Sequence, residues 1–329
     1  MPSSAVRIFT DPDEYFAGIR NLQIDGLVLQ QGKFRAASMR IDLHRLFMCR
    51  FDENLPRIMK VTPSGRRAGI VFPIDPGQPA MLVNGTEIPH GQIARVGLSW
   101  EWYLRSSAPC KWGTMSLTPE DLAAAAETIT GRELAPPTFF DTVTPSAPAL
   151  SRLRELHQAA GHLAKIAPDI VEKPEVARAM EQALVEAVVL CLAHSRSDDV
   201  GNTHRQRARV MRRLEEVLRA TSGETLYMAE LCARVGASYW MLRDCCLHYL
   251  GMSPKRYLWL RRMHLARRAL WRANTERTTV TEIASDYGFC EFGRFSVAYR
   301  SLFGESASTA LRRPGAARAE PDARYEPVT

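Results

Sequence analysis

The sequence lacks the patterns typical of a membrane protein, of an exported protein and of several common enzyme classes. It contains no run of about 18 apolar residues, so we expect no membrane span and no membrane partner. The first residues, MPSSAVRIFTDPDEYF, include no apolar segment of the kind that signal peptides need. The G-x-G-x-x-G, P-loop and G-x-S-x-G motifs are absent, which argues against the enzymes that depend on them.

The cysteines lack the spacing of a disulfide framework or a zinc site. There are seven, an odd number, and no C-x-x-C pair occurs among them. We therefore expect reduced thiols and a cytoplasmic protein. The adjacent Cys245 and Cys246 allow two interpretations, a redox switch or a small apolar pair inside a helix core.

The net charge of +7 is concentrated in the last third of the chain. Residues 203–313 contain 20 Lys and Arg against 10 Asp and Glu, a net charge of +10, whereas the other residues together carry −3. A basic segment beside a slightly acidic remainder indicates either a polyanionic partner for that segment or an ordinary solvated basic face.

Short apolar or alternating runs follow one another between residues 22 and 117. Turn residues such as Asn84-Gly85 separate them, and this spacing predicts a β-rich barrel or sandwich over residues 1–131. The expected strands are Leu27–Leu29, Arg40–Phe51, Arg57–Val61, Ala68–Pro73, Ile93–Val96, Trp100–Leu104 and Trp112–Leu117.

Residues 132–202 are expected to form a linker and helices. Before them, Thr118 and Pro119 begin a helix that reaches about Ile129, because threonine caps helices and proline favours their first position. Prolines between 136 and 148 indicate a linker, and helices are expected near 149–167 and 174–194. The second helix is apolar over much of its circumference, so it either packs within its own domain or forms a dimer interface. Residues 314–329 are expected to be a disordered tail.

From residue 203 onward the apolar periodicity is helical and contains an internal repeat. We expect helices over 205–220, 226–235, 238–249, 254–273, 280–287, 291–303 and 306–313. A helix, a glycine that permits a sharp turn and a second helix occur twice, around Gly236 and around Gly288. This arrangement predicts two helix-turn-helix units within residues 203–313.

In a helix-turn-helix unit the second helix enters the major groove of double-stranded DNA. The positions expected to form two small cores are Leu231, Val235 and Leu242, and Ile283, Ala284, Phe289, Phe295 and Tyr299. The residues left to face bases are Tyr239, Trp240, Arg243, Glu291 and Arg294, and the expected phosphate contacts are Lys255, Arg256 and Arg300. Arginine can bind guanine through two hydrogen bonds, and glutamate can accept one from cytosine.

Some of these residues allow another interpretation. Trp240 could be half-buried packing, and Glu291 could cap the helix that follows it. Phe292 could belong to the core or to the DNA-facing surface.

Two segments resemble the double helix-turn-helix domain of the AraC/XylS family of bacterial transcription regulators. They are GMSPKRYLWLRRMHLARRAL and VTEIASDYGFCEFGRFSVAYRSLFGES. The matching positions of the first are Gly251, Ser253, Pro254, Tyr257, Leu258, Arg262, Ala266 and Leu270. Those of the second are Ile283, Ala284, Gly288, Phe289, Phe295, Tyr299, Phe303 and Gly304.

The resemblance covers about residues 222–313 and implies two recognition helices, about 238–249 and 291–303, in successive major-groove segments of one DNA face. It implies a sequence-specific transcription regulator, by analogy an activator, that works with RNA polymerase at the nucleoid. The chain departs from the family pattern at Asp244, Cys246, Val297 and Ala307. We expect these changes to weaken binding by one protomer, so that a homodimer or a bound effector is needed.

The resemblance also implies that the β-rich domain is a sensor or regulatory domain with a cupin-like barrel, which binds a small-molecule effector or mediates dimerisation. Its aromatic residues either line an apolar pocket or form the barrel core; they are Trp100, Trp102, Tyr103 and Trp112. The predicted fold class is therefore α+β and multidomain, with a helical linker region and an all-α C-terminal domain.

The rival hypothesis is a cupin-type metal enzyme that carries an accessory DNA-binding domain. A cupin metal site needs two histidines at alternate positions of one strand, a carboxylate and a third histidine. Residues 22–117 offer only His44 and His90, far apart in sequence, with Glu87 near the second. We therefore expect no metal, no other cofactor, no catalytic residue and no enzymatic activity.

Overall fold

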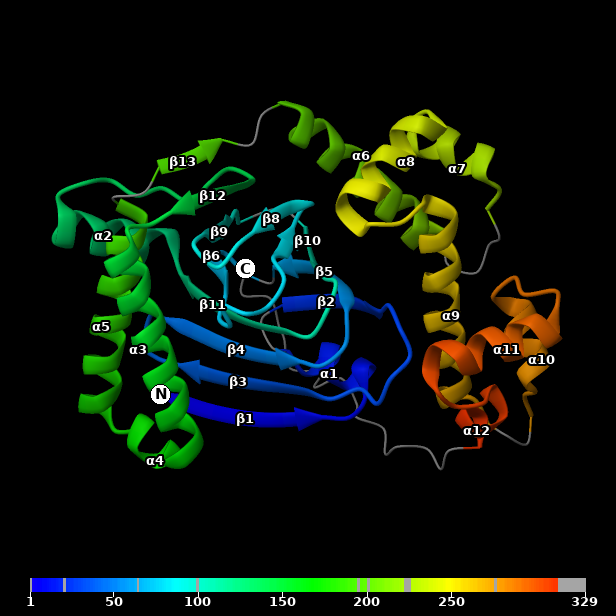
Figure 1. The fold of residues 1–329 in the computed structure, drawn as a ribbon, viewed down its shortest axis with the longest axis horizontal. Helices are drawn as coiled ribbons and strands as arrows, with labels where there is room; N and C mark the ends of the chain where they lie inside the picture. Colours follow the sequence, from blue (N-terminus) through cyan, green and yellow to red (C-terminus); the bar gives the residue numbers. More distant parts are fainter. Residues whose placement is uncertain are drawn as a thin grey trace, which may run out of the picture.

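The computed structural model describes residues 2–312 apart from 20–21, 64, 99–100, 194–195, 200–201, 222–225 and 275–276. The tail expected at 314–329 lies outside the described residues, and so does Trp100. Strands and the helices that cover them occupy the chain up to Asp199, and the described residues after it form only helices and their connections (Figure 1). The α+β class with a β-rich N-terminal domain and a helical C-terminal part is confirmed.

The β-rich domain consists of two antiparallel sheets. The eight-stranded sheet has the order β1 (Ser3–Phe9), β3 (Ala36–Asp42), β4 (Phe47–Glu53), β11 (Cys110–Leu117), β6 (Ala68–Pro73), β9 (Ile93–Val96), β12 (Phe140–Thr144) and β13 (Arg196–Asp199). The five-stranded sheet has the order β2 (Leu22–Val28), β5 (Arg57–Pro63), β10 (Trp102–Ser106), β7 (Met81–Val83) and β8 (Thr86–Ile88). Within the described chain the two sheets do not join into a closed barrel, so the expected cupin-like barrel is an open pair of sheets.

Two of the predicted boundaries in this domain were wrong. The run Arg40–Phe51 is not one strand, because β3 ends at Asp42 and β4 begins at Phe47. Leu43 and Leu46 close the turn between them with buried side chains, and only His44 and Arg45 at its tip are polar and exposed, so the sequence there lacks the glycine, proline or asparagine that marks most turns. The expected linker at 136–148 contains β12, whose Phe140 and Val143 are buried against β9 and the sheet core.

Aromatic side chains and one buried ion pair occupy part of the space between the two sheets. Phe51 of β4 stacks on Trp112 of β11 with ring centroids 4.1 Å apart. Arg57 of β5 lies 2.7 Å from Glu53 of β4, and Tyr15 of α1 (Pro12–Gly18) donates to the same carboxylate at 2.5 Å. All three polar residues are buried, so the pair joins the two sheets through the core.

The outer face of the eight-stranded sheet is covered by helices, as Figure 1 shows for α3 and α5. These are α2 (Pro119–Thr130), α3 (Ala147–Ile166), α4 (Pro168–Val171) and α5 (Pro174–Ala193). Thr118 caps α2 by accepting from Asp121 N, which confirms the predicted start. The apolar face of α5 is buried against α2, α3 and the sheet, which favours packing within the domain over a dimer interface.

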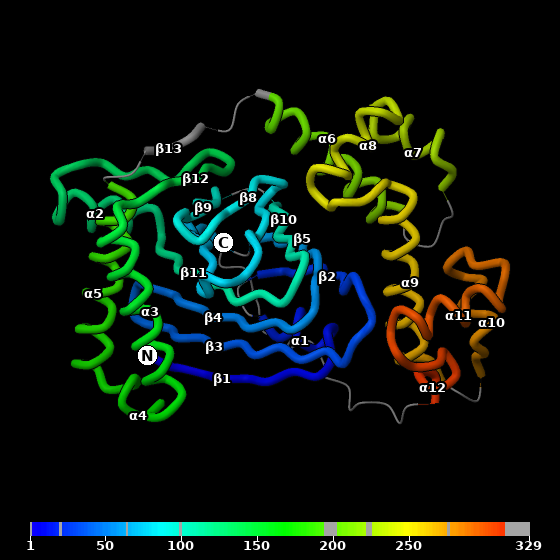
Figure 2. Tube along the Cα trace, in the orientation of Figure 1, coloured from blue at the N-terminus to red at the C-terminus, as the bar shows by residue number. Residues whose placement is uncertain are grey.

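The C-terminal part contains seven helices among the described residues. They are α6 (Asn202–Ala220), α7 (Met228–Val235), α8 (Tyr239–Leu250), α9 (Pro254–Arg272), α10 (Val280–Asp286), α11 (Phe292–Phe303) and α12 (Ala307–Leu311). The long helix α9 connects the group α6–α8 with the group α10–α12, and the two groups lie at its opposite ends (Figure 2). All seven expected helices are present, with ends shifted by a few residues.

Candidate nucleic-acid interface

The first helix-turn-helix unit is α7, Gly236 and α8. Gly236 ends α7 with φ of 69°, a left-handed conformation that other residues adopt at an energetic cost. Ser238 then begins α8 by accepting from Met241 N. The expected core residues Leu231, Val235 and Leu242 are all buried, which confirms the unit.

The second unit, α10, Gly288 and α11, is built in the same way. Thr279 and Glu282 form a capping box at the start of α10, each side chain accepting from the other residue's backbone N–H. Gly288 has φ of 74° in the turn. The expected core is confirmed: Ile283, Ala284, Phe295 and Tyr299 are buried, and Phe289 packs against Phe295 with ring centroids 4.9 Å apart.

The predicted base-facing residues of α8 lie on its solvent side. Trp240 is 72% exposed and Tyr239 is 42% exposed, and their rings make an edge contact with centroids 5.8 Å apart. Arg243 is exposed, and its guanidinium lies 5.9 Å from the centre of the Trp240 ring. The interpretation of Trp240 as half-buried packing is therefore wrong. A contact of these three residues with bases stays a prediction.

The predicted residues of α11 are equally accessible. Arg294 and Glu291 form an ion pair at 2.9 Å, with side chains that are 83% and 64% exposed. Glu291 stands at the N-cap position but makes no capping hydrogen bond, so the capping interpretation is not supported. Arg300 is exposed, and Phe292 is 39% exposed, on the surface rather than in the core.

The predicted phosphate contacts Lys255 and Arg256 lie at the exposed start of α9. The Arg256 guanidinium stacks 4.2 Å from the centre of the Trp259 ring, an arrangement that orders a long cationic side chain. Their phosphate role stays a prediction, as does that of Arg300.

The departures from the family pattern in α8 have a local explanation. Asp244 forms an ion pair with Arg207 of α6 at 2.9 Å, so it ties the recognition helix to the helix before it. Cys245 and Cys246 are fully buried, and burial raises the pKa of Cys245 to about 11. Buried, protonated thiols are poor nucleophiles, which favours the small apolar pair over a redox switch.

The outer face of the five-stranded sheet packs against α6, α8 and α9, and Glu215 of α6 is at the centre of this contact. Its carboxylate has no exposed surface. It accepts from Tyr257 OH at 2.7 Å and Tyr103 OH at 3.2 Å, and it lies 3.3 Å from Arg261 and 3.4 Å from Lys60. Burial, followed by the charge of Glu215, raises the pKa of both tyrosines, so they stay protonated donors.

A second cluster holds the other half of α9 against the N-terminal domain. Arg267 is buried and lies 3.0 Å from Asp11 and 2.9 Å from Asp13, while its guanidinium stacks 3.7 Å from the centre of the Trp271 ring. Arg268 reaches Asp13 at 2.6 Å. These acids and arginines therefore connect the N-terminal domain directly to the helix that carries both units.

These interdomain residues were not predicted, although two of them have a signal in the sequence. Glu215 lies between Leu214 and Leu218 on the apolar side of α6, and Arg267 has the same relation to Met263 and Leu270 in α9. A charged residue at such a position must find a buried partner, since an unpaired buried charge is costly. Its partner's identity has no signal in the sequence.

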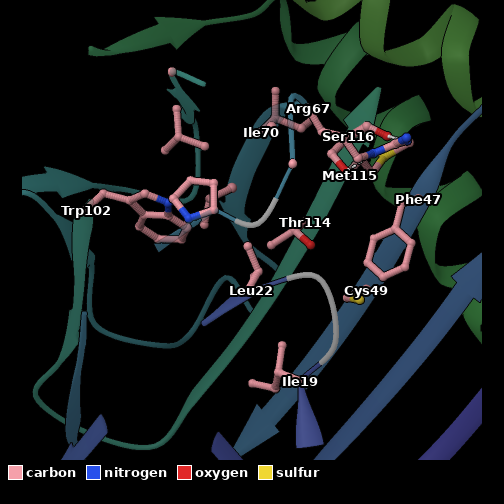
Figure 3. Close-up of a pocket in the computed structure, with 16 residues that line it drawn as sticks. Ile19, Leu22, Phe47, Cys49, Arg67, Ile70, Trp102, Thr114, Met115 and Ser116 are labelled. Atoms are coloured by element: carbon pink, nitrogen blue, oxygen red, sulfur yellow. Dashed lines mark hydrogen bonds between the residues drawn. The ribbon is translucent and has the colours of Figure 1, made fainter. Parts of the chain in front are cut away.

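A cavity of about 70 Å³ lies between the two sheets. Figure 3 shows Trp102 on one side and Phe47 and Cys49 on the other, with Thr114 between them. The lining is mainly apolar, and Arg67 donates to the Ser116 hydroxyl at 3.2 Å. Of the four predicted aromatic residues, Trp102 lines this cavity, Trp112 belongs to the core and Tyr103 faces Glu215.

The histidines of the rival hypothesis lie apart. His44 is exposed, and His90 Nδ1 lies 3.1 Å from Arg154 of α3. Within the described residues no three His, Cys, Asp or Glu side chains come together as a metal site requires. In the same part of the chain, no helix has the length and apolar character of a membrane span.

Comparison with known proteins places the similarity in the C-terminal part. Residues 231–313 match the family model described as "Helix-turn-helix domain". The chain is 31% identical to the "Probable thc operon regulatory protein" of Rhodococcus erythropolis over 139 residues, and the aligned segment is 42% of each chain. It is 45% identical to the "XylDLEGF operon transcriptional activator 1" of Pseudomonas putida over 65 residues, and this segment is 20% of each chain. The chain therefore aligns with less than half the length of these relatives.

One solved structure is titled as a probable AraC family transcriptional regulator from Rhodopseudomonas palustris. It is 31% identical, covers 32% of this chain and 95% of its own, and superposes with a TM-score of 0.29, too low for a structural conclusion. The relatives named above are transcriptional regulators. The confirmed units, the matched family model and these regulators agree, and residues 231–313 are a helix-turn-helix domain of the AraC/XylS type.

Proposed function

We propose that the chain is a sequence-specific DNA-binding transcription regulator that inserts α8 and α11 into successive major-groove segments on one face of the DNA. The observation that carries this proposal is the mounting of both recognition helices on one continuous helix, α9. With 19 residues, α9 is about 28 Å long, close to the roughly 34 Å of one DNA turn. The net charge of +10 over 203–313 supports a polyanionic partner.

The proposed contacts divide into two kinds. Tyr239, Trp240 and Arg243 of α8, and Glu291 and Arg294 of α11, contact base edges, since they project from the solvent side of the recognition helices. Lys255, Arg256 and Arg300 contact phosphates, which carry no sequence information but set the register.

The N-terminal domain regulates this activity in the proposed scheme. The cavity between the sheets takes a small, largely apolar effector, and any anionic group on it lies near Arg67. The five-stranded sheet forms one wall of the cavity and also contacts α9 through Glu215, so occupancy can alter the geometry of the recognition helices. The regulator acts as a homodimer and as an activator with RNA polymerase, in the cytoplasm at the nucleoid.

Selection of genomic DNA fragments on the purified full chain, at near-physiological salt, tests the proposal. Two short boxes about one helical turn apart are the expected result. Retention that is strong only at low salt and independent of sequence would count against sequence-specific binding by the protein alone.

A pair of substitutions in α11 tests the division of contacts. Arg294→Ala should relax base preference at one position of the second box, whereas Arg300→Ala should weaken binding to all sequences evenly. Both side chains are exposed, so neither change should affect folding. The same loss of preference in both variants would contradict the assignment.

A further inference from the structure

Val297 lies at the centre of the outward face of α11. It is 72% exposed, as exposed as Trp240, although valine is a β-branched apolar residue that neither water nor a helix favours. The buried residues of the same helix, Phe295, Tyr299 and Leu302, lie on the opposite side, since successive residues are separated by about 100° around the axis. Packing against the described residues therefore does not account for this valine.

A line of small residues runs along the helix through Val297. Gly293 precedes it by one turn, and Ser301 follows it by one turn. A Cβ added to Gly293 would meet no atom within 4 Å, and the residue has ordinary helical backbone, so neither packing nor conformation requires glycine. Glycine within a helix is destabilising, and a surface that must approach another molecule closely gives a reason for it.

Arginines border this line on both sides. Arg294 lies three residues before Val297 and Arg300 three residues after it, and both are exposed. The arginines favour DNA as the molecule that approaches. Within the major groove the only apolar group that a base presents is the 5-methyl group of thymine.

We propose that Val297 contacts the 5-methyl group of a thymine in the second box, and that Gly293 provides the clearance for this close approach. The inference rests on the proposed function, because it names what one side chain selects at that site. Val297 is then a specificity-determining residue that favours thymine at one position of the second box. That position lies between the base that Arg294 contacts and the phosphate that Arg300 contacts.

The test uses fluorescent duplexes of the selected site in which each thymine is replaced, one at a time, by uracil, which lacks only the methyl group. At one position of the second box the wild-type Kd should rise about fourfold, as expected for the loss of one buried methyl contact. Val297→Ala should bind the thymine duplex about fourfold more weakly and show no further loss with uracil. Uracil in the first box is the matched control and should affect both proteins alike.

Each other outcome has a distinct meaning. Absence of any selected site would remove the proposed function itself. Specific binding that tolerates uracil throughout the second box would overturn the role of Val297 alone, and so would an equal uracil effect in wild type and Val297→Ala. Reduced transcription by Val297→Ala with unchanged DNA affinity would show that the residue contacts a protein, which also overturns the inference. Folding is not at risk, since alanine is the better helix former.

Discussion

Replacement of Glu215 by glutamine should weaken the contact between the N-terminal domain and the helices that carry the DNA-binding units. The carboxylate is fully buried and receives Tyr257, Tyr103, Arg261 and Lys60 within 3.4 Å. The glutamine has nearly the same shape, so the perturbation removes the negative charge while largely preserving the packing.

The expected decrease in the free energy of unfolding follows from the charged partners that Glu215→Gln leaves behind. Removing one member of a buried ion pair costs about 3–5 kcal/mol, because the other charge stays buried. Arg261 keeps Asp25 at 3.2 Å, and Lys60 keeps Glu101 at 3.8 Å, so each cation retains a second carboxylate. We therefore expect the low end of the range, about 3 kcal/mol.

Glu216→Gln is the matched control on the same helix. Its side chain is 55% exposed and faces Arg212 at 3.5 Å, an exposed helix pair worth about 0.3 kcal/mol. Urea unfolding of the full chain, followed by tryptophan fluorescence, measures both variants. Glu215→Gln should also separate the unfolding of the N-terminal domain from that of the C-terminal part.

Equal, small effects of the two substitutions would refute the reasoning that Glu215 holds the two parts together. If Glu215→Gln unfolds earlier as expected, the DNA affinity of the folded variant then shows whether the contact regulates binding. An unchanged affinity, with and without effector, would contradict the proposed regulation through α9 while leaving the stability argument intact.

Three further predictions concern the folded chain. Gly236→Ala should destabilise the protein by about 1–2 kcal/mol in urea unfolding, because alanine resists the positive φ there. Gly293→Ala should stabilise the protein by about 0.5–1 kcal/mol, because alanine is the better helix former and its Cβ meets no atom. The same sign for both substitutions would contradict this reasoning. Thr279→Ala should cost about 1 kcal/mol through loss of the capping box, and an effect no larger than that of Thr281→Ala on the exposed side of α10 would show that the cap is unimportant. Burial, with Arg50 beside it, lowers the pKa of His157 to about 3. The unfolded chain therefore gains a proton near pH 6.5 that the native chain does not, and native stability should fall by about 1.4 kcal/mol per pH unit from about pH 6.5 down to about pH 3; His157→Gln should make this slope shallower, and an unchanged slope would exclude His157 as a source.

The helical part of the fold was predictable because its signals are local. Glycines at the turns and apolar residues at helical spacing lie within a few positions of one another, so Gly236 and Gly288 marked both units correctly. The β-rich part was predicted only in outline. The turn at 43–46 was missed because His44 and Arg45 at its tip are flanked by the apolar, buried Leu43 and Leu46. Strand β12 was missed because it pairs with β9, which lies more than 40 residues earlier in the chain.

The candidate site also has one part that was predictable from the sequence and one part that was not. Exposure of Trp240, Arg243 and Arg294 followed from their places on helices whose apolar faces were evident. The significance of Val297 did not follow, because an outward valine has no sequence signature until the surface around it is known.

The sequence by itself determined that this chain carries two helix-turn-helix units on a basic C-terminal segment, because helix caps, turns and amphipathic faces depend on neighbouring residues. Only the tertiary structure decided that the N-terminal domain rests on α6 and α9 through Glu215, Arg261 and Arg267, and that a cavity lies between the sheets. The interdomain contact brings together residues more than 150 positions apart, such as Lys60 and Glu215. Such pairings are selected by the packing of the whole chain and have no local signal.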